Sequence, residues 1–280
     1  MTSKVSIVIS VYKPEKEVFD KVKEMLKKQT IKAEIIETWN MPEAKSMNSG
    51  IKRAKGDIVI LLSQDCVPED EFWLEKLIKP LENKEVIATT SDLYLPEWYW
   101  KKYPFLVRIL TLNERLIRFP TMDARACAYR KKDLEDMGLF NEDPRIIAVE
   151  HEIYLRLKEK GKIVRAEVIV NHLHRFNNLK EIIKTIYNYS ESNGKVIRED
   201  GTKSTPFTFW TRIIRATPFL GFLSMCYRFP FKKYFSWFPI FLLLAPINNV
   251  INVFGFWKGF FINEESKRNT IVLKDTNSPT

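Results

Sequence analysis

The sequence has little of what stabilises small extracellular domains or zinc modules, because its 280 residues include only three cysteines. Cys66, Cys127 and Cys226 lie far apart and form no Cys-x-x-Cys pair. This scarcity argues against a disulfide framework or a structural zinc site, and it fits a reducing compartment. The N-terminus also lacks an apolar signal segment, so we expect the body of the protein in the cytosol.

Acidic residues are missing from one long stretch of the chain. Residues 206–262 contain no Asp or Glu, six Lys or Arg residues, and 18 of the chain's 36 aromatic residues. The formal net charge of the whole chain is +10, which favours an anionic partner such as a phosphorylated substrate, a nucleic acid or a lipid surface. Because the cations of this stretch lie among apolar runs, we expect a membrane surface there and no nucleic acid.

The same stretch lacks an uninterrupted hydrophobic run of membrane-spanning length. Residues 235–261 would be long enough, since a span needs about 20 residues, but prolines, asparagines and Lys258 interrupt them. Scattered Trp and Tyr residues are typical of an interfacial belt. We therefore expect in-plane helices or a shallow re-entrant hairpin, in a peripheral or monotopic protein at the cytoplasmic face of the cell membrane. The alternative is a buried helical cap or a dimer interface.

Short apolar runs alternate with amphipathic segments in the rest of the chain. Strands are predicted at residues 5–11, 33–37, 58–62, 85–91, 122–130 and 162–170, and helices at 15–28, 44–54, 69–82, 149–161 and 179–192. The strands at 5–11 and 58–62 are apolar at nearly every position, as in a sheet buried on both faces. We expect an α/β fold with a mostly parallel sheet, helices on both of its faces and a C-terminal helical extension. Residues 95–120 are aromatic and basic, and are expected to cover a site, to contact an acceptor or to pack against the sheet edge.

The strand at 58–62 leads to the first candidate site residue. It ends in Ser63, Gln64 and Asp65, and the acidic residues after Pro68 indicate the start of a helix. In open α/β sheets, ligands bind beyond the carboxyl ends of the strands. Asp65 therefore stands where a carboxylate can hold a divalent metal against phosphates. An Asp in such a loop also serves simply to turn the chain.

Two further clusters fall at a helix start and at a strand end. Glu150 and Glu152 open a predicted helix, where a carboxylate acts as a general base or only complements the helix dipole. His172 and His174 share one face of extended chain, as metal or phosphate ligands or as an ordinary surface pair. Cys66 has no evident basic partner and is interpreted as a small apolar filler.

Six stretches in a fixed order form a specific set. They are Val5-Ser-Ile-Val-Ile-Ser-Val-Tyr12, Asn48-Ser-Gly-Ile-Lys-Arg-Ala-Lys-Gly-Asp57, Ser63-Gln-Asp-Cys-Val-Pro68, Ala126 to Arg130 with Gly138-Leu-Phe-Asn-Glu142, Val149 to Leu157, and His172-Leu-His174. This set resembles the inverting nucleotide-sugar glycosyltransferases of glycosyltransferase family 2, which have the GT-A fold. The resemblance covers roughly residues 5–175, and the Gln-Asp-x-x-Pro form is similar to the rhamnosyltransferase-like branch.

The resemblance implies inverting transfer of a sugar from a nucleoside diphosphate sugar to a hydroxyl of a lipid-linked or cell-surface glycan, in polysaccharide or glycolipid biosynthesis. It implies Mg or Mn as cofactor, with Asp65, His172 and His174 as metal ligands. It makes Glu150 the general base, or His151 if the register is shifted by one residue. The donor-binding residues that it implies are Val11, Tyr12, Glu37, Asn48, Gln64, Asp65 and Arg130.

The resemblance also implies a division of the chain. Residues 1–175 would form the catalytic domain, 176–205 a helix and connecting loop, 206–262 the membrane-interface helices and 263–280 a polar tail. Two alternatives to this function stay open. One is a polyprenyl-phosphate hexosyl synthase, and the other is a catalytically inactive membrane-bound scaffold with the same fold.

The sequence departs from the family pattern at three places. Gln64 leaves Asp65 as the only carboxylate of the metal motif, and Val149 stands where the family has Glu. The acidic nucleotide-binding motif usual after the second strand is replaced by residues 36–40, Ile-Glu-Thr-Trp-Asn. At that position Glu37 or Trp39 would serve the base and ribose of the donor.

Overall fold

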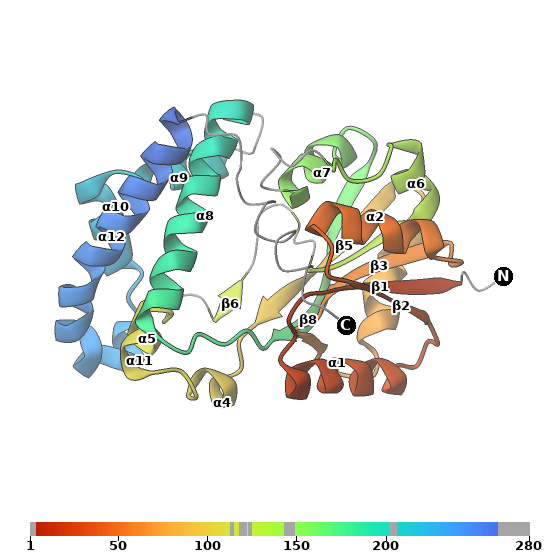
Figure 1. The fold of residues 1–280 in the computed structure, drawn as a ribbon, viewed down its shortest axis with the longest axis horizontal. Helices are drawn as coiled ribbons and strands as arrows, with labels where there is room; N and C mark the ends of the chain where they lie inside the picture. The colour runs from red at the N-terminus through yellow and green to blue at the C-terminus, as the bar shows by residue number, and fades with distance from the viewer. Residues whose placement is uncertain are drawn as a thin grey trace, which may run out of the picture. The chain divides into compact units, whose positions relative to one another are not determined.

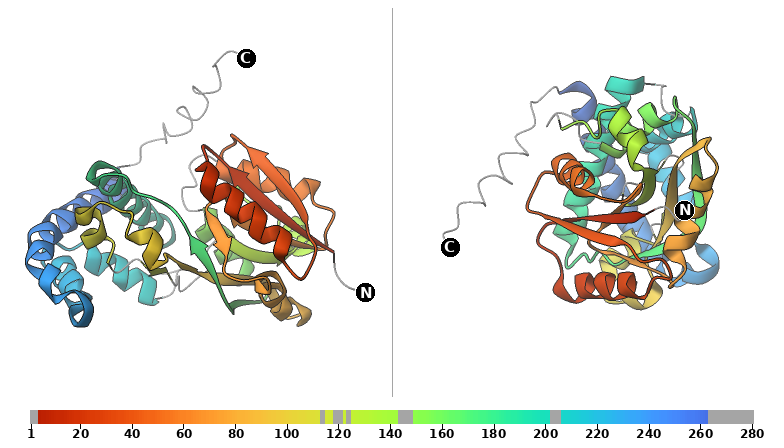
Figure 2. Two further views of the ribbon diagram at one scale, coloured as in Figure 1. Left: turned by 90° about the horizontal axis from the view of Figure 1, so that it is seen from below. Right: turned by 90° about the vertical axis from the view of Figure 1, so that its right-hand side faces the viewer.

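The computed structural model describes residues 4–112, 115–117, 122, 125–142, 149–201 and 206–262. The chain forms two compact units, one from Met1–Tyr94 and Ile117–Leu173 and the other from Leu95–Leu116 and His174–Glu264. Both are drawn in Figures 1 and 2. The predicted polar tail at 263–280 lies outside the described residues.

The first unit is an α/β structure built on one sheet. Its elements are β1 (Val5–Val11), α1 (Lys16–Lys28), β2 (Glu34–Trp39), α2 (Glu43–Arg53), β3 (Ile58–Ser63), β4 (Cys66–Pro68), α3 (Trp73–Ile78), η1 (Lys79–Glu82), β5 (Val86–Tyr94), β7 (Ala126–Arg130), α6 (Lys131–Asp136), α7 (Val149–Leu157) and β8 (Lys162–His172). The strand order is β2-β1-β3-β7-β5-β8-β4, and β6 (Leu116–Ile117) pairs with β5.

The sheet is mixed, whereas the sequence predicts a mostly parallel one. β1 is parallel to β2 and β3, and β5 is parallel to β8. β7 lies antiparallel between β3 and β5, and β4 is antiparallel to β8. A short apolar strand buried on both faces has the same residue pattern in either direction, so strand direction could not be predicted from composition. The expected α/β class with flanking helices is confirmed.

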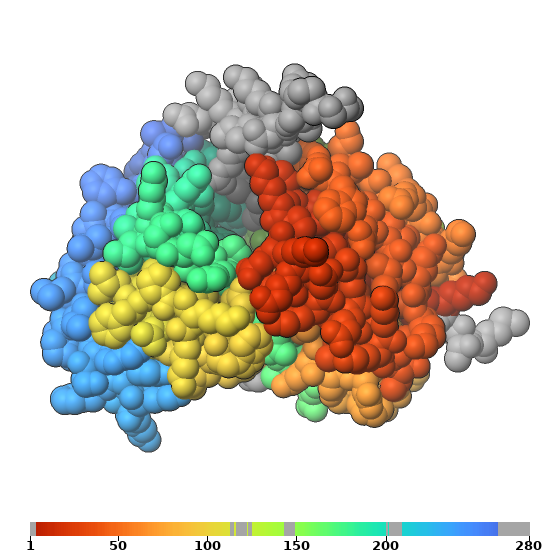
Figure 3. Space-filling view, turned by 60° about the horizontal axis from the view of Figure 1, so that its bottom comes forward, coloured from red at the N-terminus to blue at the C-terminus, as the bar shows by residue number. Residues whose placement is uncertain are grey.

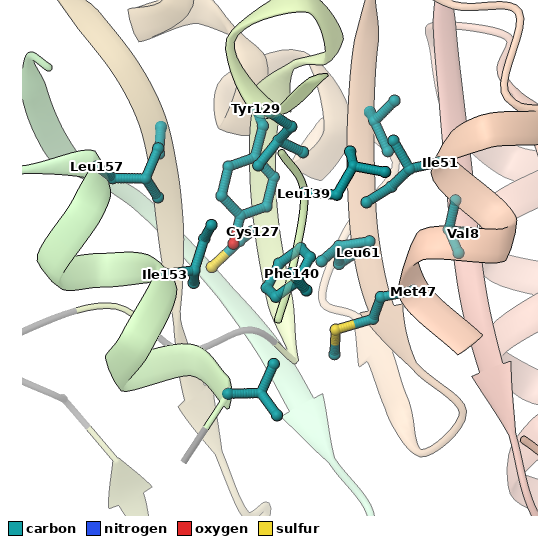
Figure 4. Close-up of a cluster of buried hydrophobic side chains, with 14 of the residues drawn as sticks. Val8, Met47, Ile51, Leu61, Cys127, Tyr129, Leu139, Phe140, Ile153 and Leu157 are labelled. Carbon is teal, nitrogen blue, oxygen red and sulfur yellow. The ribbon is translucent and has the colours of Figure 1, made fainter. Parts of the chain in front are cut away.

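Helices α2, α6 and α7 cover one face of the sheet, and α1 covers the other (Figure 1). The main core lies under α2 and α7, where Met47, Leu61 and Ile153 pack together in one buried cluster (Figure 4). In the same cluster the ring of Tyr129 meets that of Phe140 edge to face, 6.4 Å between centroids. On the opposite side, α1 buries an apolar stripe with helical spacing, as the sequence predicts.

Two glycines let α2 and the following turn approach β1 closely. A Cβ on Gly50 would overlap the side chain of Val8, and a Cβ on Gly56 would lie 2.7 Å from the carbonyl oxygen of Lys4. Any side chain at either position would push α2 or β3 away from β1. The glycines of the Asn-Ser-Gly and Lys-Gly-Asp parts of the sequence motif are therefore required for close packing against β1.

The helix predicted at 69–82 is wrong at its start. Residues 66–68 form the short strand β4, and α3 begins only at Trp73. β4 pairs with β8, where Cys66 lies opposite His172. The backbone N–H of Glu69 also donates to the carbonyl of Ile169, so sheet pairing replaces the first helical turn.

The second unit is helical. Its elements are α4 (Glu97–Trp100), α5 (Phe105–Leu110), α8 (Leu179–Asp200), α9 (Pro206–Arg215), α10 (Pro218–Tyr227), α11 (Phe231–Tyr234), η3 (Phe235–Trp237) and α12 (Phe238–Phe261). Helices α8 and α12 run side by side in the same direction (Figures 1 and 2). Gly194 and Gly259 permit this contact, because a Cβ on either would overlap a backbone carbonyl of the other helix.

Residues 95–110 belong to this helical unit, and their aromatic side chains pack against its C-terminal helices. The ring of Trp100 stacks on Trp237 at 6.0 Å between centroids, and the guanidinium of Arg108 lies 5.4 Å from the Trp237 ring. The Nζ of Lys233 lies 2.8 Å from a carboxylate oxygen of Glu97. In Figure 3 the yellow surface of 95–110 accordingly adjoins the blue surface of the C-terminal helices. The sequence alone does not predict this partner for the 95–120 segment.

Helix α12 is continuous through Pro246. The stretch Phe231–Phe261 is long and apolar enough to cross a membrane by length and composition, with a mean hydropathy of 1.7 over an 18-residue window. Two of its asparagines, Asn249 and Asn252, face neighbouring helices. Asn252 accepts from the hydroxyl of Ser190 on α8 at 2.6 Å, and the Asn249 side chain is 3% exposed.

Candidate functional site

The ends of three parallel strands create the edge of the sheet where the sequence places the site. β1 pairs with β2 up to Val11 opposite Trp39, and with β3 up to Ser10 opposite Ser63. The carboxyl ends of all three strands therefore lie together, and Gln64 and Asp65 follow directly. A chain of buried hydroxyls fixes this edge, since Thr38 bonds Ser46 at 2.6 Å and Ser46 donates to Ser10 at 2.9 Å.

Gln64 joins the end of β3 to the end of β1. Its Oε1 accepts from the backbone N–H of Tyr12 at 2.8 Å, and its Nε2 donates to the Tyr12 carbonyl at 2.9 Å. Both hydrogen-bonding ends of the amide are thus used on one backbone residue. A carboxylate would accept the first bond but has no proton for the second. Gln64 therefore positions the Val11–Tyr12 backbone beside Asp65.

The end of β2 presents an aromatic ring and a carboxylate at the same edge. The indole N–H of Trp39 donates to Glu37 at 3.0 Å, and the Trp39 side chain meets Phe19 edge to face. Trp39 remains 44% exposed, so one side of a rigid ring is open to a ligand.

Asp65, Cys66 and His172 form a group with metal-ligand chemistry. Asp65 Oδ2 lies 3.3 Å from His172 Nε2, and one ligand atom from each of the three residues lies within 4.8 Å of the others. Cys66 and His172 are directly opposed in the β4–β8 ladder, and the N–H of Leu173 donates to the Asp65 carbonyl at 2.8 Å. Backbone pairing therefore fixes the backbone positions of all three residues. A carboxylate, an imidazole and a thiol form a donor set that suits a divalent transition metal.

The sequence predicts Asp65 and His172 as ligands, and the structure brings these two together. His174 belongs to the helical unit, where its ring packs on Phe176 at 4.8 Å between centroids and its backbone carbonyl accepts from the Tyr103 hydroxyl. Cys66, which the sequence analysis interprets as a small apolar filler, is fully buried beside Asp65 and His172. Only its register against His172 reveals this, and no local signal in the sequence carries that register.

The first turn of α7 contains three titratable residues, Glu150, His151 and Glu152, which differ in burial and in their partners. Glu152 forms a tight ion pair with Arg156, with 2.6 Å between Oε1 and Nε, and Arg156 also donates to the carbonyls of Met137 and Leu139. His151 is buried, at 5% exposure, whereas Glu150 is half-buried. Of the two candidates for a general base, Glu150 is thus the one with more of its surface accessible to solvent.

Two predicted donor-binding residues make structural contacts. Asn48 donates to the Phe140 carbonyl and to Glu142 at 2.8 Å each, and accepts from the Phe140 N–H at 3.0 Å, which ties α2 to the 138–142 segment. An open depression of about 420 Å³ lies beside these residues. Arg130 lies opposite Ile58, at the other end of β3 from Asp65, and donates to the carbonyls of Leu81, Asn83 and Val86.

Comparison with known proteins agrees with this arrangement. Residues 16–138 match the family described as Glycosyl transferase family 2, so the matched segment includes Gln64 and Asp65. The chain is similar in structure to the mannosyltransferase PcManGT from Pyrobaculum calidifontis in complex with GDP-Man and Mn2+, with a TM-score of 0.60 and 13% identity, covering 94% of this chain and 89% of that chain. No curated protein matches the sequence. At this identity the likeness concerns the fold, which is the expected GT-A arrangement.

Proposed function

We propose that this chain is a glycosyltransferase of family 2 that transfers a sugar, with inversion, from a nucleoside diphosphate sugar to an acceptor hydroxyl. The observation that carries the proposal is the Asp65–His172 pair at the carboxyl edge of the sheet, with Asp65 inside the segment that matches this family. The structural neighbour with GDP-Man and Mn2+ supports the same class of donor and cofactor. The donor sugar is a hexose or deoxyhexose, and the Gln-Asp-x-x-Pro form points to the rhamnosyltransferase-like branch.

Asp65 and His172 would hold the divalent cation, Mg2+ or Mn2+. When bound, such an ion acts as a Lewis acid that neutralises charge on the leaving diphosphate. The remaining exposure of the two side chains, 23% for Asp65 and 16% for His172, leaves a solvent-facing side for phosphate oxygens. The backbone of Val11 and Tyr12, held by Gln64, and the open ring of Trp39 would position the nucleoside beside it.

Glu150 would act as the general base. Its carboxylate takes the proton from the acceptor hydroxyl while that oxygen forms a bond to the anomeric carbon. The bond between the anomeric carbon and the diphosphate oxygen breaks on the opposite side, and the nucleoside diphosphate leaves with the electron pair. The proton then passes from Glu150 to solvent. Glu152 stays paired with Arg156 and supports the start of α7.

The acceptor is a lipid-linked or cell-surface glycan, and the helical unit would hold the protein at the cytoplasmic face of the membrane. Helix α12 has an exposed apolar stripe at spacings of three, four and seven residues. Its members are Leu243 at 73%, Ile247 at 54%, Val250 at 50%, Phe254 at 70% and Phe261 at 72% exposure. With six cations and no acid in residues 206–262, this surface complements an anionic leaflet.

The pairing of α12 with α8 favours an in-plane arrangement over a span. Ser190 bonds Asn252 and Arg198 donates to the Gly259 carbonyl, so α8 is held to α12 at two places along its length. A crossing α12 would carry α8 into the hydrocarbon together with its exposed Lys184. Each Lys, Arg or Asp at the centre of a membrane helix costs about 2.5–3.5 kcal/mol. An amphipathic pair on the surface has no such cost.

Asp65→Ala tests the catalytic proposal. Purified parent and variant are incubated with a panel of nucleoside diphosphate sugars, including GDP-Man and rhamnosyl donors, with Mn2+ or Mg2+, and nucleoside diphosphate release is measured. We expect release by the parent with at least one donor and loss of release by Asp65→Ala at an unchanged thermal midpoint. A parent inactive with every donor and acceptor would support the scaffold alternative. Equal activity of the variant would remove Asp65 from the mechanism.

Vesicle flotation tests the membrane proposal. We expect full-length protein to float with vesicles containing anionic lipid, and Phe254→Glu on the exposed stripe to weaken flotation strongly. Phe72→Glu, at an exposed position of the first unit, is the matched control and should float like the parent. High salt should release the parent only in part, because apolar insertion is not screened. Complete release by salt, or equal flotation of Phe254→Glu, would contradict this placement.

A further inference from the structure

The sulfur of Cys66 sits at the inner side of the proposed metal site. The side chain is 0% exposed, whereas those of Asp65 and His172 keep a solvent-facing side. Directly opposed residues in an antiparallel ladder project from the same face of the sheet, with Cβ atoms about 4.5–5.5 Å apart. Cys66 and His172 are such a pair, so the thiol and the imidazole point to the same space.

The spacing of the three ligand atoms suits one metal ion. Metal–nitrogen and metal–sulfur bonds of ~2.1 and ~2.3 Å put neighbouring ligand atoms about 3.0–3.7 Å apart, depending on geometry. Asp65 Oδ2 and His172 Nε2 are already 3.3 Å apart. The Sγ of Cys66 lies 3.9 Å from Asp65 Oδ1, and the whole group stays within 4.8 Å. Small side-chain rotations would therefore bring all three onto one ion.

We propose that Cys66 is a third metal ligand and that it selects the metal. This inference rests on the proposed function, which places the cofactor on Asp65 and His172. Thiolate and imidazole favour Co2+ and Zn2+, while Mg2+ binds mainly to carboxylates, carbonyls and water. A site with only Asp65 as an oxygen ligand and with sulfur at its inner side therefore prefers thiophilic divalent metals to Mg2+. On binding, the Sγ–H proton leaves to solvent and a sulfur–metal bond forms.

The test measures metal binding without a nucleotide sugar. Purified protein is titrated with Co2+ and with Mg2+, and sulfur coordination is read from the thiolate-to-cobalt charge-transfer absorption. We expect this absorption in the parent and its loss in Cys66→Ser. We also expect Co2+ binding to weaken in Cys66→Ser by at least the ~10–100-fold that the loss of even an outer-shell partner typically causes. Mg2+ binding should change little.

A double variant assigns the sulfur without altering Cys66. Cys127→Ala with Cys226→Ala leaves Cys66 as the one thiol of the sequence, since the chain has three cysteines. Persistence of the charge-transfer absorption in this variant supports Cys66 as a ligand even if Cys66→Ser fails to fold. Co2+ binding without that absorption, or no Co2+ binding by the parent, would overturn the proposal. Sulfur coordination in a protein that transfers no sugar would refute the proposed function and leave the ligand assignment intact.

Discussion

Substitutions of Gln64 can distinguish two possible roles of this residue, which are positioning the backbone and binding the metal. The structure gives Gln64 two hydrogen bonds, both to the backbone of Tyr12, at 2.8 and 2.9 Å. Gln64→Glu keeps the acceptor for the Tyr12 N–H but removes the donor, and it places a negative charge against the Tyr12 carbonyl. The same change adds a second carboxylate beside Asp65. If Gln64 acts by holding the Tyr12 backbone, Gln64→Glu should lower the free energy of unfolding. If the side chain at position 64 binds metal, Gln64→Glu should raise the metal affinity.

The magnitude follows from the two hydrogen bonds. Each intramolecular hydrogen bond contributes about 0.5–1.5 kcal/mol net, so Gln64→Ala should lower the free energy of unfolding by about 1–3 kcal/mol. The side chain is half-buried, which favours the lower part of this range because water replaces the lost partners. At roughly 2–4 °C per kcal/mol for a chain of this size class, the thermal midpoint should fall by a few degrees.

Thermal melting and metal titration of the same samples decide the question. We expect Gln64→Ala and Gln64→Glu to melt below the parent, and neither to bind Mn2+ or Co2+ more tightly. Met41→Ala, at an exposed loop position after β2, is the control for a local truncation and should melt like the parent. A raised thermal midpoint or a markedly tighter metal affinity in Gln64→Glu would refute the proposal that Gln64 acts by holding the Tyr12 backbone.

Three further predictions concern catalysis, packing and pH. Glu150→Gln should reduce turnover by about 10²–10⁴ with donor affinity unchanged; a mild effect there together with a severe one for His151→Ala would shift the base by one residue. Asn48→Ala removes three hydrogen bonds at a buried position, so we expect a loss of about 2–4 kcal/mol in urea unfolding. The pKa of Glu97 is lowered from 4.5 to about 2, first by the hydrogen bond from Lys233 and then by the one from Lys101. Its stabilising effect is therefore complete above pH 4.5 and lost as the pH falls towards 2, so the unfolding midpoints of the parent and Glu97→Gln should converge over that range.

The part of the site that could be predicted from the sequence depends on local patterns. The strand predicted at 5–11 is β1 residue for residue, and the strand predicted at 58–62 is β3 with Ser63 added. Apolar runs between turn residues identify such strands without knowledge of their partners. Because parallel strands end at one edge, the positions of Val11, Gln64 and Asp65 follow from these strands alone.

The metal group could not be predicted as a whole, because its third ligand depends on a pairing between distant segments. β4 has three residues and ends in proline, so its sequence indicates a turn or the start of a helix. The strand exists because β8 supplies the partner backbone, and the same ladder sets Cys66 opposite His172. For Arg130, by contrast, the sequence predicts a contact that the structure does not show. Its motif suggested a contact with the donor, but the antiparallel direction of β7 places it at the far end of β3.

The asparagines of α12 have a different role in the structure from the one that the sequence suggests. In the sequence they interrupt a hydrophobic run, and this interruption favours in-plane helices. In the structure they do not break the helix, because Asn252 bonds Ser190 and Asn249 is buried against neighbouring helices. The remaining outer face of α12 is apolar, which by itself would favour a span. The charged residues of α8, and not the asparagines, therefore favour an in-plane helix. Helix α12 cannot separate from α8 without exposing Gly194 and Gly259, where the two helices are in close contact.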